Sequence, residues 1–189
     1  KTLQDQITEQ NNKVSTPTYE EIITHDDMIS LPSDVKEGQL KVGLKGFTAQ
    51  NLVRNGDFRD GTNGWAVDYG TISVNSNTLN VVGKGDYKYA RTKQSILTVG
   101  QSFFVKAKVR VTNSVCLSLS ISDGFGGFTS GATVISPVAN TWYELSGIKS
   151  SAEYKELFIT QNYTDAATAK DKVMEVKDVV AINLTATFG

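Results

Sequence analysis

Cysteine and histidine are almost missing from the sequence, which holds only Cys116 and His25 among 189 residues. One cysteine cannot form an intrachain disulfide, so nothing here indicates an oxidising compartment. A Ser-His-Asp or Cys-His site would have to use His25, which lies in a polar stretch far along the chain from Cys116. A zinc site of thiolates and imidazoles would need more ligands than these two residues supply.

An excess of charge of one sign and long apolar runs are lacking too. Lys and Arg number 19 against 20 for Asp and Glu, a formal net charge of -1. This balance gives no broad attraction for nucleic acid or an anionic membrane. No apolar run approaches the roughly 18 residues of a membrane span. The acidic residues show no pattern that selects two of them for glycoside hydrolysis. We therefore expect a protein that is not an enzyme, binds no nucleic acid and does not insert into a membrane.

Residues 1–45 differ from the rest of the sequence. They are polar and begin at Lys1, with neither an initiating Met nor a signal peptide, so we expect residues to be missing upstream. The sequence predicts an N-terminal extension here, either a helical or an extended tether. Within it, residues 40–44 alternate apolar and polar side chains, which predicts one short strand.

Alternation with a period of two dominates residues 46–189. In residues 103–111 every second residue is apolar, with Lys and Arg between, and residues 115–121 alternate in the same way. This pattern is typical of antiparallel strands with one face in a core and one in water. It would place Cys116 on the polar face beside Ser118 and Ser120. Because no base is evident nearby, we expect a half-buried and inert side chain there, with a catalytic thiol as the alternative. Turn residues separate the segments, and the fold class predicted is all-β, an antiparallel sandwich. Further strands are expected at 70–74, 78–83, 86–92, 94–98, 132–136, 141–148, 155–162 and 173–185.

The segment Asn51-Leu52-Val53-Arg54-Asn55-Gly56-Asp57-Phe58, followed by Gly61 and Gly64-Trp65, resembles the opening strand of galactose-binding-like jelly rolls. Several carbohydrate-binding module families belong to this group. Residues 140–147 and 176–180 resemble a late strand and the closing strand of the same modules. The resemblance implies a jelly-roll β-sandwich over residues 46–189. We expect Phe58 and Trp65 in its core, and one of Trp142 and Tyr143 facing inward.

Residues 182–189 and the sequence Gly46-Phe47-Thr48-Ala49-Gln50-Asn51-Leu52 resemble segments of tail and fibre proteins from phages of Gram-positive bacteria. This resemblance implies a non-catalytic structural and binding module of a phage tail protein, located in the virion and extracellular when it acts. Its expected partners are other tail subunits, in a homo-oligomer, and host cell-wall carbohydrate. The alternative is a carbohydrate-binding module attached to a secreted or cell-wall-active enzyme. Because this fold hosts many functions, the motifs indicate the fold more strongly than the ligand.

One candidate site is for a structural calcium ion, and no other cofactor is expected. The alternation places Asp178 on the same face as Met174, Val176, Val180, Ile182 and Leu184, where a carboxylate is costly unless it is paired or metal-bound. Related modules often hold calcium between the opening turn and this closing Asp, with oxygen ligands. Arg59 stands where the family has an acid, so Asp57 or Asp60 would substitute. The alternative is an Asp178 satisfied by Arg59, a lysine or backbone amides.

A second candidate site is a glycan surface. Sugar sites combine aromatic side chains with planar polar groups, and a Gly-rich loop with aromatics at a sandwich edge is a plausible recognition element. The alternative is that these aromatics cover the ends of the core or contact another subunit. The candidates are Tyr87, Tyr89 and Arg91 on one strand, Phe125 and Phe128 in the loop 123–131, and Gln161 and Tyr163 at the end of another strand.

Overall fold

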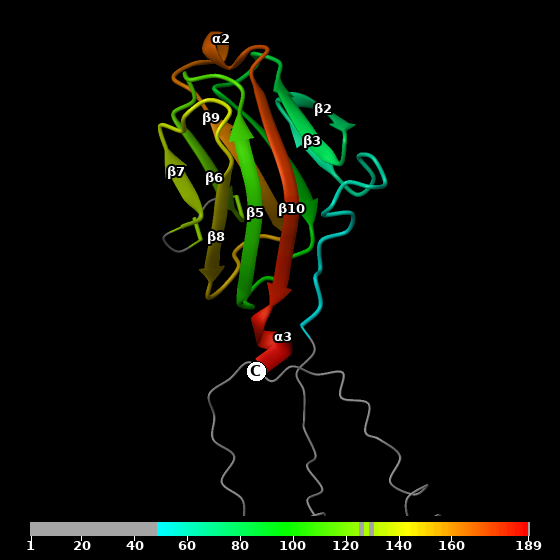
Figure 1. Cartoon of the computed structure of the whole chain (residues 1–189). Coiled ribbons are helices and arrows are strands. Elements are labelled where there is room, and N and C mark those ends of the chain that lie inside the picture. The colour runs from blue at the N-terminus through cyan, green and yellow to red at the C-terminus, as the bar shows by residue number, and fades with distance from the viewer. Residues whose placement is uncertain (1–48, 125–126, 129–130, 189) are drawn as a thin grey trace, which may run out of the picture. The chain divides into compact units, whose positions relative to one another are not determined.

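Two antiparallel five-stranded sheets lie face to face in the part of the chain that the computed structural model describes, residues 49–124, 127–128 and 131–188 (Figure 1). The expected extension 1–45, with its strand at 40–44, lies outside these residues. The strand order is β1-β4-β9-β6-β7 in one sheet, called the first sheet below, and β2-β3-β10-β5-β8 in the second sheet. Every strand pair is antiparallel. The predicted all-β jelly-roll sandwich is therefore confirmed.

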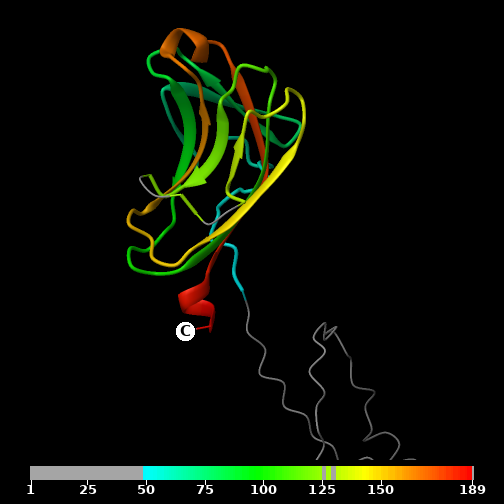
Figure 2. The same ribbon diagram turned by 90° about the vertical axis from the view of Figure 1, so that its left-hand side faces the viewer.

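The element bounds follow the predicted strands closely. The first sheet contains β1 (Ala66–Asp68), β4 (Tyr89–Ser95), β9 (Glu156–Asn162), β6 (Ser118–Ser122) and β7 (Thr133–Ile135). The second contains β2 (Gly70–Asn75), β3 (Thr78–Gly83), β10 (Val173–Asn183), β5 (Phe103–Val111) and β8 (Tyr143–Lys149). Two short helices, α2 (Ala166–Ala169) and α3 (Leu184–Phe188), lie at opposite ends of the sandwich in both views (Figure 1 and Figure 2).

The core forms between the sheets because alternate side chains of each strand point inward. In β5, Phe103, Val105, Ala107, Val109 and Val111 are all fully buried, while the residues between them are half-buried. Burying one such apolar side chain stabilises the fold by about 1.5–3 kcal/mol relative to leaving it in water. No helix among the described residues is long and apolar enough to cross a membrane.

The opening motif serves structure. Its Asn51 side chain accepts hydrogen bonds from the backbone amides of Val53 (3.1 Å) and Ala181 (2.9 Å), which attaches the start of the sandwich to β10. Trp65 donates its indole N–H to the carbonyl of Asn55 at 3.2 Å. Phe58 and Trp65 are buried with ring centroids 5.3 Å apart, so their predicted place in the core is confirmed.

Two strand predictions are corrected at the ends of strands. The segments predicted as strands 86–92 and 94–98 form one strand, β4, because no turn interrupts it. The strand predicted from residue 115 begins only at Ser118. The alternation fails before it, so Val115 and Leu117 are exposed and Cys116 is buried. Burial raises the pKa of the Cys116 thiol, which favours its protonated, unreactive form.

A β-bulge in β10 corrects the expected position of Asp178. The pairing between β10 and β5 shifts register between Lys177 and Val180, and Asp178 adopts a left-handed backbone with φ 53°. One extra residue reverses the alternation, so Val179 rather than Val180 is buried and Asp178 is exposed. Asp178 therefore does not share the apolar face of Met174 and Val176, as the simple alternation predicted.

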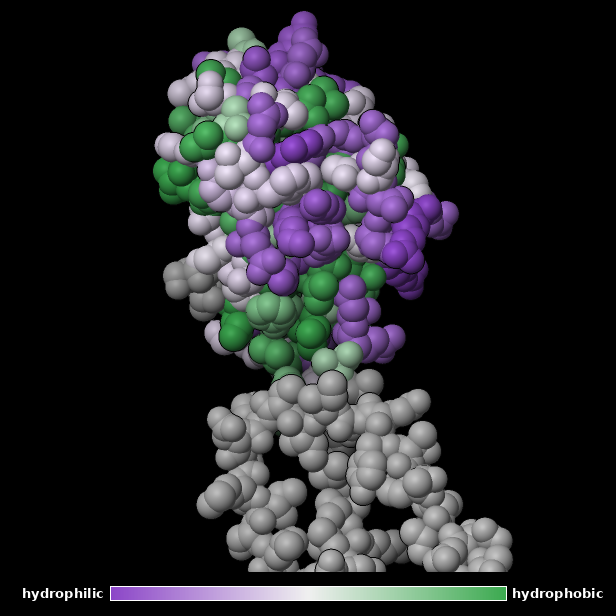
Figure 3. All heavy atoms as spheres, viewed as in Figure 1, coloured by the Kyte–Doolittle hydropathy of each residue, from purple (hydrophilic) through white to green (hydrophobic). Residues whose placement is uncertain are grey.

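The outer face of the second sheet is largely hydrophilic, with apolar atoms gathered at the end toward α3 (Figure 3). At that end Ile148, Phe104 and Ile182 lie side by side across β8, β5 and β10. Of the pair Trp142 and Tyr143, Tyr143 packs against the core. The Trp142 ring instead contacts the side chains of Arg110 and Lys177.

Candidate functional site

The outer face of the first sheet carries an ordered set of polar and aromatic side chains. In β4 and β6 every second residue is buried, so the alternate residues point outward. In β9 all five central residues are buried, and its outward residues follow from their pairing with the outward residues of β4 and β6. Antiparallel pairing then aligns them in three rows across the strands. The rows are Tyr89, Asn162, Ser118 and Ile135; Asp68, Arg91, Thr160, Ser120 and Thr133; and Ala66, Lys93, Phe158 and Ser122.

Two adjoining hollows open on this face, and Tyr89, Arg91 and Gly124 line both. The serine hollow, of about 210 Å³, is completed by Ser120, Ser122, Thr160 and Asn162. The aromatic hollow, of about 300 Å³, is completed by Tyr154, Glu156 and Phe158. We refer to the two together as the cleft. It offers hydroxyls, one amide, aromatic surface, one guanidinium and, in the aromatic hollow, the carboxylate of Glu156, a set of groups that suits a polar organic ligand.

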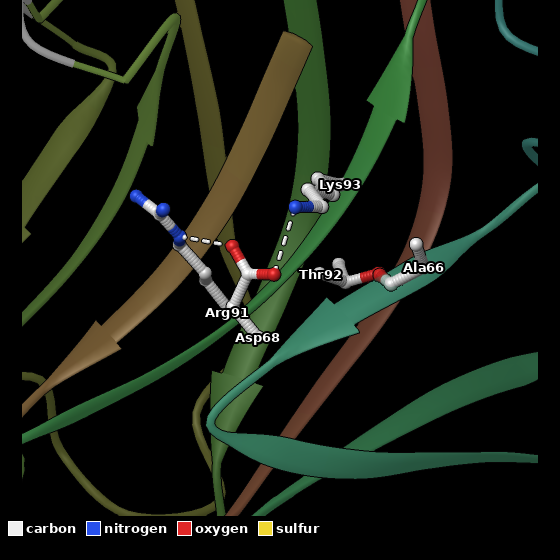
Figure 4. Close-up of polar contacts among 5 residues, drawn as sticks. All are labelled: Ala66, Asp68, Arg91, Thr92 and Lys93. Carbon is white, nitrogen blue, oxygen red and sulfur yellow. Dashed lines mark hydrogen bonds and ion pairs between the residues drawn. The ribbon is translucent and has the colours of Figure 1, made fainter. Parts of the chain in front are cut away.

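Arg91 is held rigidly at the boundary between the hollows. Its Nε donates to Asp68 Oδ2 at 2.9 Å, and its Cζ lies 3.9 Å from the Phe158 ring centroid and 5.3 Å from that of Tyr89. Figure 4 shows the terminal nitrogens of Arg91 directed away from Asp68. A guanidinium fixed by an ion pair and two aromatic rings loses little further freedom when it binds a ligand.

Asp68 is shared by two cations. Lys93 Nζ lies 2.8 Å from its Oδ1, opposite the bond from Arg91. Burial on its own raises the pKa of Asp68, but the hydrogen bonds and charges of Lys93 and Arg91 outweigh burial and leave that pKa below its usual value. The hydroxyl of Thr92 donates to the carbonyl of Ala66 at 3.0 Å, which holds β1 against β4 beside this group (Figure 4).

Three tyrosines form an aromatic cluster at one end of the cleft. The rings of Tyr69 and Tyr87 are stacked with centroids 5.0 Å apart, and both meet Tyr89 edge-on at 5.1 and 4.7 Å. Tyr69 and Tyr87 are 41% and 44% exposed, so their rings are available to a ligand. Tyr69 lies between β1 and β2 in a left-handed backbone conformation, φ 58°. A fixed aromatic surface of this kind suits the apolar face of a sugar ring.

The structure brings Tyr87, Tyr89 and Arg91 together as predicted, but it places three other candidates in the interior. Gln161 and Tyr163 are buried, and the Tyr163 hydroxyl donates to Gln161 Oε1 at 2.7 Å. The predicted glycan surface at this strand end is therefore corrected, because both side chains point between the sheets. Phe128 is buried as well, and Phe125 lies outside the described residues.

Sequence reasoning missed most of the cleft. Ser120, Ser122, Thr160 and Phe158 share the outward parity of Arg91, but this becomes visible only once the pairing of β6 and β9 with β4 is known. Tyr69 precedes β2 with no motif around it. The alternating serines of β6 are the sequence signal for this part of the cleft, and by themselves they indicate only a face in contact with water.

The region of the predicted calcium site forms a hollow of about 350 Å³ at the β10 bulge, lined by Asn51, Asn55, Asp57 and Asp178 among others. Asp57 lies 3.1 Å from Arg59 Nε, and Asp178 lies 3.0 Å from Lys108 Nζ. Asp60 does not line the hollow and accepts a hydrogen bond from Asn63 at 2.6 Å. The carboxylates of Asp57 and Asp178 thus each already face a cation of the chain, and this arrangement does not fit a calcium site. Calcium binding remains a prediction.

The fold and the cleft define an antiparallel β-sandwich with an open polar-aromatic groove on one sheet. A solved tandem of two family 22 carbohydrate-binding modules, from Xyn10C of Paenibacillus barcinonensis, is similar at 16% identity and a TM-score of 0.52, over 74% of this chain and 47% of that chain. At 16% identity the similarity is one of fold alone. No family model and no curated protein matches the sequence.

Two other solved structures are similar at lower TM-scores. TmCBM61, solved in complex with β-1,4-galactotriose, has 14% identity and a TM-score of 0.45, over 71% of this chain and 99% of that one. Tailspike protein 4 of bacteriophage CBA120 has 17% identity and a TM-score of 0.44, over 69% of this chain and 21% of that one.

Proposed function

We propose that this protein is a non-catalytic glycan-binding module, and that the cleft on the first sheet is its binding site. The observation that carries the proposal is the tyrosine cluster beside Arg91. Exposed, mutually fixed aromatic rings stand next to a row of hydroxyl and amide groups on a rigid sheet. Aromatic surface contacts the apolar face of a sugar, while the planar and hydroxyl groups bond its oxygens. The shared fold with a carbohydrate-binding module tandem supports the proposal without naming a ligand.

Binding to a panel of purified cell-wall polysaccharides, measured by calorimetry, tests this proposal. We expect the variant Tyr69→Ala/Tyr87→Ala to bind about fivefold to a hundredfold more weakly, since each of the two ring contacts is worth about 0.5–1.5 kcal/mol and 1.4 kcal/mol is tenfold. The control is Trp142→Ala, which removes an aromatic ring from the second sheet. Equal binding by the wild type and the tyrosine variant would move the binding site away from the cleft. An absence of binding to every polysaccharide would overturn the function.

The biological setting is a further part of the proposal. Residues 46–52 and 182–189 resemble segments of tail proteins from phages of Gram-positive bacteria, which supports a virion module that contacts host cell wall and assembles with other tail subunits as a homo-oligomer. The alternative, a module of a secreted or cell-wall-active enzyme, is favoured by the similarity to the Xyn10C tandem. Mass spectrometry of purified virions, together with the mass of the full chain in solution by light scattering, separates the two. A monomer absent from virions would favour the enzyme-linked module.

A further inference from the structure

The two hollows of the cleft differ in charge. Among the lining residues of the serine hollow, Arg91 is the one charged group, and no carboxylate lines it. The acid of the cleft, Glu156, lines only the aromatic hollow. Ser120, Ser122 and Thr160 place three hydroxyls around the serine hollow, and their side chains form no hydrogen bond with another described residue. The serine hollow thus presents one cation and several free hydrogen-bonding groups.

The charge beside the hollow is only partly neutralised. Among the described residues, Asp68 is the single carboxylate that pairs with both Arg91 and Lys93, which leaves these three groups with a net charge of about +1. The Arg91 side chain is only 22% exposed, so water does little to screen this charge. Its Nε bonds Asp68, while its terminal nitrogens form no hydrogen bond with any described residue. The free edge of a guanidinium matches two oxygens of one anionic group.

We propose that the cleft selects a glycan that carries an anionic group, and that this group binds Arg91 in the serine hollow. The inference rests on the proposed glycan-binding function and adds the class of ligand. The anion is a carboxylate of a uronic acid or a phosphate of a phosphodiester-linked sugar, because both present paired oxygens to a guanidinium. Tyr89 lines the hollow and contacts the tyrosine cluster, so the sugar ring next to the anion lies against these rings. The serine and threonine hydroxyls bond the remaining oxygens of the anion.

The experiment compares three matched probes by calorimetry at low and at raised salt: a tetragalacturonate, its full methyl ester, and a phosphodiester-linked oligosaccharide of similar length. We expect at least one of the two anionic probes to bind tenfold or more tightly than the ester, with a preference that shrinks as salt rises. Which anionic probe binds identifies the source of the charge. In Arg91→Gln the preference for the anionic probe over the ester falls to below threefold. Arg91→Lys keeps the positive charge but lacks the planar guanidinium, so its preference is intermediate between those of wild type and Arg91→Gln. The matched control Lys177→Gln removes a cation from the second sheet and leaves the preference unchanged.

Failure of this inference is distinct from failure of the proposed function. Equal affinity of wild type for the ester and for both anionic probes overturns the anionic selection but keeps a glycan site, and this result is independent of whether any variant folds. A preference for either anionic probe that persists in folded Arg91→Gln, judged by its thermal melting, overturns the role of Arg91. Binding of none of the three probes, nor of any polysaccharide in the panel above, overturns both.

Discussion

Replacing Gln161 by Leu separates a core role from a binding role for this side chain. Gln161 Nε2 donates to the carbonyls of Val81 (3.0 Å) and Lys172 (3.3 Å), and Oε1 accepts the Tyr163 hydroxyl, so the side chain links the first sheet to the second. Leu has a similar volume but removes these three hydrogen bonds, while the Tyr163 hydroxyl keeps its bond from Asn113 and the Lys172 carbonyl keeps its bond from the Gly83 amide. Each lost hydrogen bond costs about 0.5–1.5 kcal/mol, and a buried group left without any partner costs about 1–3 kcal/mol. After the gain from burying a leucine, we expect a loss of about 2–4 kcal/mol in the free energy of unfolding.

Thermal melting and calorimetry together measure the outcome. At roughly 3 °C per kcal/mol for a domain of this size, the melting temperature falls by about 6–12 °C. Glycan affinity at a temperature where the variant is folded stays within about twofold of wild type, since a twofold change is well under 1 kcal/mol. The control Ser73→Ala, on the exposed outer face of β2, changes stability by less than about 0.5 kcal/mol. A Gln161→Leu protein that melts like wild type but no longer binds glycan would refute the buried role.

Three further outcomes follow from the described contacts. Gly56→Ala destabilises the protein by about 1–3 kcal/mol in urea unfolding, because a Cβ there would lie 2.3 Å from the carbonyl oxygen of Val179. A free energy of unfolding equal to that of wild type would contradict the packing at the bulge. The pKa of Asp68 is lowered in the folded state, so its contribution to stability is present above the unfolded pKa and is lost as the pH falls through the folded pKa. Asp68→Asn is then less stable than wild type at pH 7, and the gap closes in strong acid; a gap that is constant with pH would argue against the ion pairs. Calcium can raise the melting temperature of wild type only if the metal displaces Lys108 from Asp178. We therefore expect wild type to melt at the same temperature in calcium and in EDTA, and Lys108→Ala to melt at a higher temperature in calcium. A calcium-dependent rise in wild type alone would contradict this account.

The strands were predictable because burial on one face imposes a period of two on the sequence. β5 has an unbroken alternation, and its predicted bounds coincide with the observed Phe103–Val111. The alternation misleads where the backbone adds a residue or leaves the sheet. The bulge at Asp178 reverses the parity of the second half of β10, and residues 112–117 run as an irregular segment that buries Cys116. Neither event changes the local pattern of residue types enough to be seen in the sequence.

The cleft was predictable only along one strand. Tyr87, Tyr89 and Arg91 share a parity on or next to β4, and the structure places them together. The residues opposite them come from β6 and β9, at sequence separations that give no information about register without the sheet order. At the end of β9 the sequence did not distinguish Asn162, which faces the cleft, from its neighbours Gln161 and Tyr163, which face the core. A polar residue is usually expected outside, and Gln161 is inside because its amide is fully hydrogen-bonded there.

The hydrogen bonds between Asn51 and β10 determine how the sandwich responds to a pulling force. Asn51 pairs with Ile182, so the described chain reaches and leaves the sandwich at neighbouring points at the α3 end. A pulling force applied through these two points acts across one short pairing and opens it bond by bond, whereas a force applied at opposite ends of the sandwich would have to shear whole strands at once. The first bonds to break are those of the Asn51 side chain with Ala181 and Val179. Tension would thus first detach the residues around Asn51 from β10. The cleft lies on the other sheet and contains none of these residues, so it keeps its structure until the core itself unfolds.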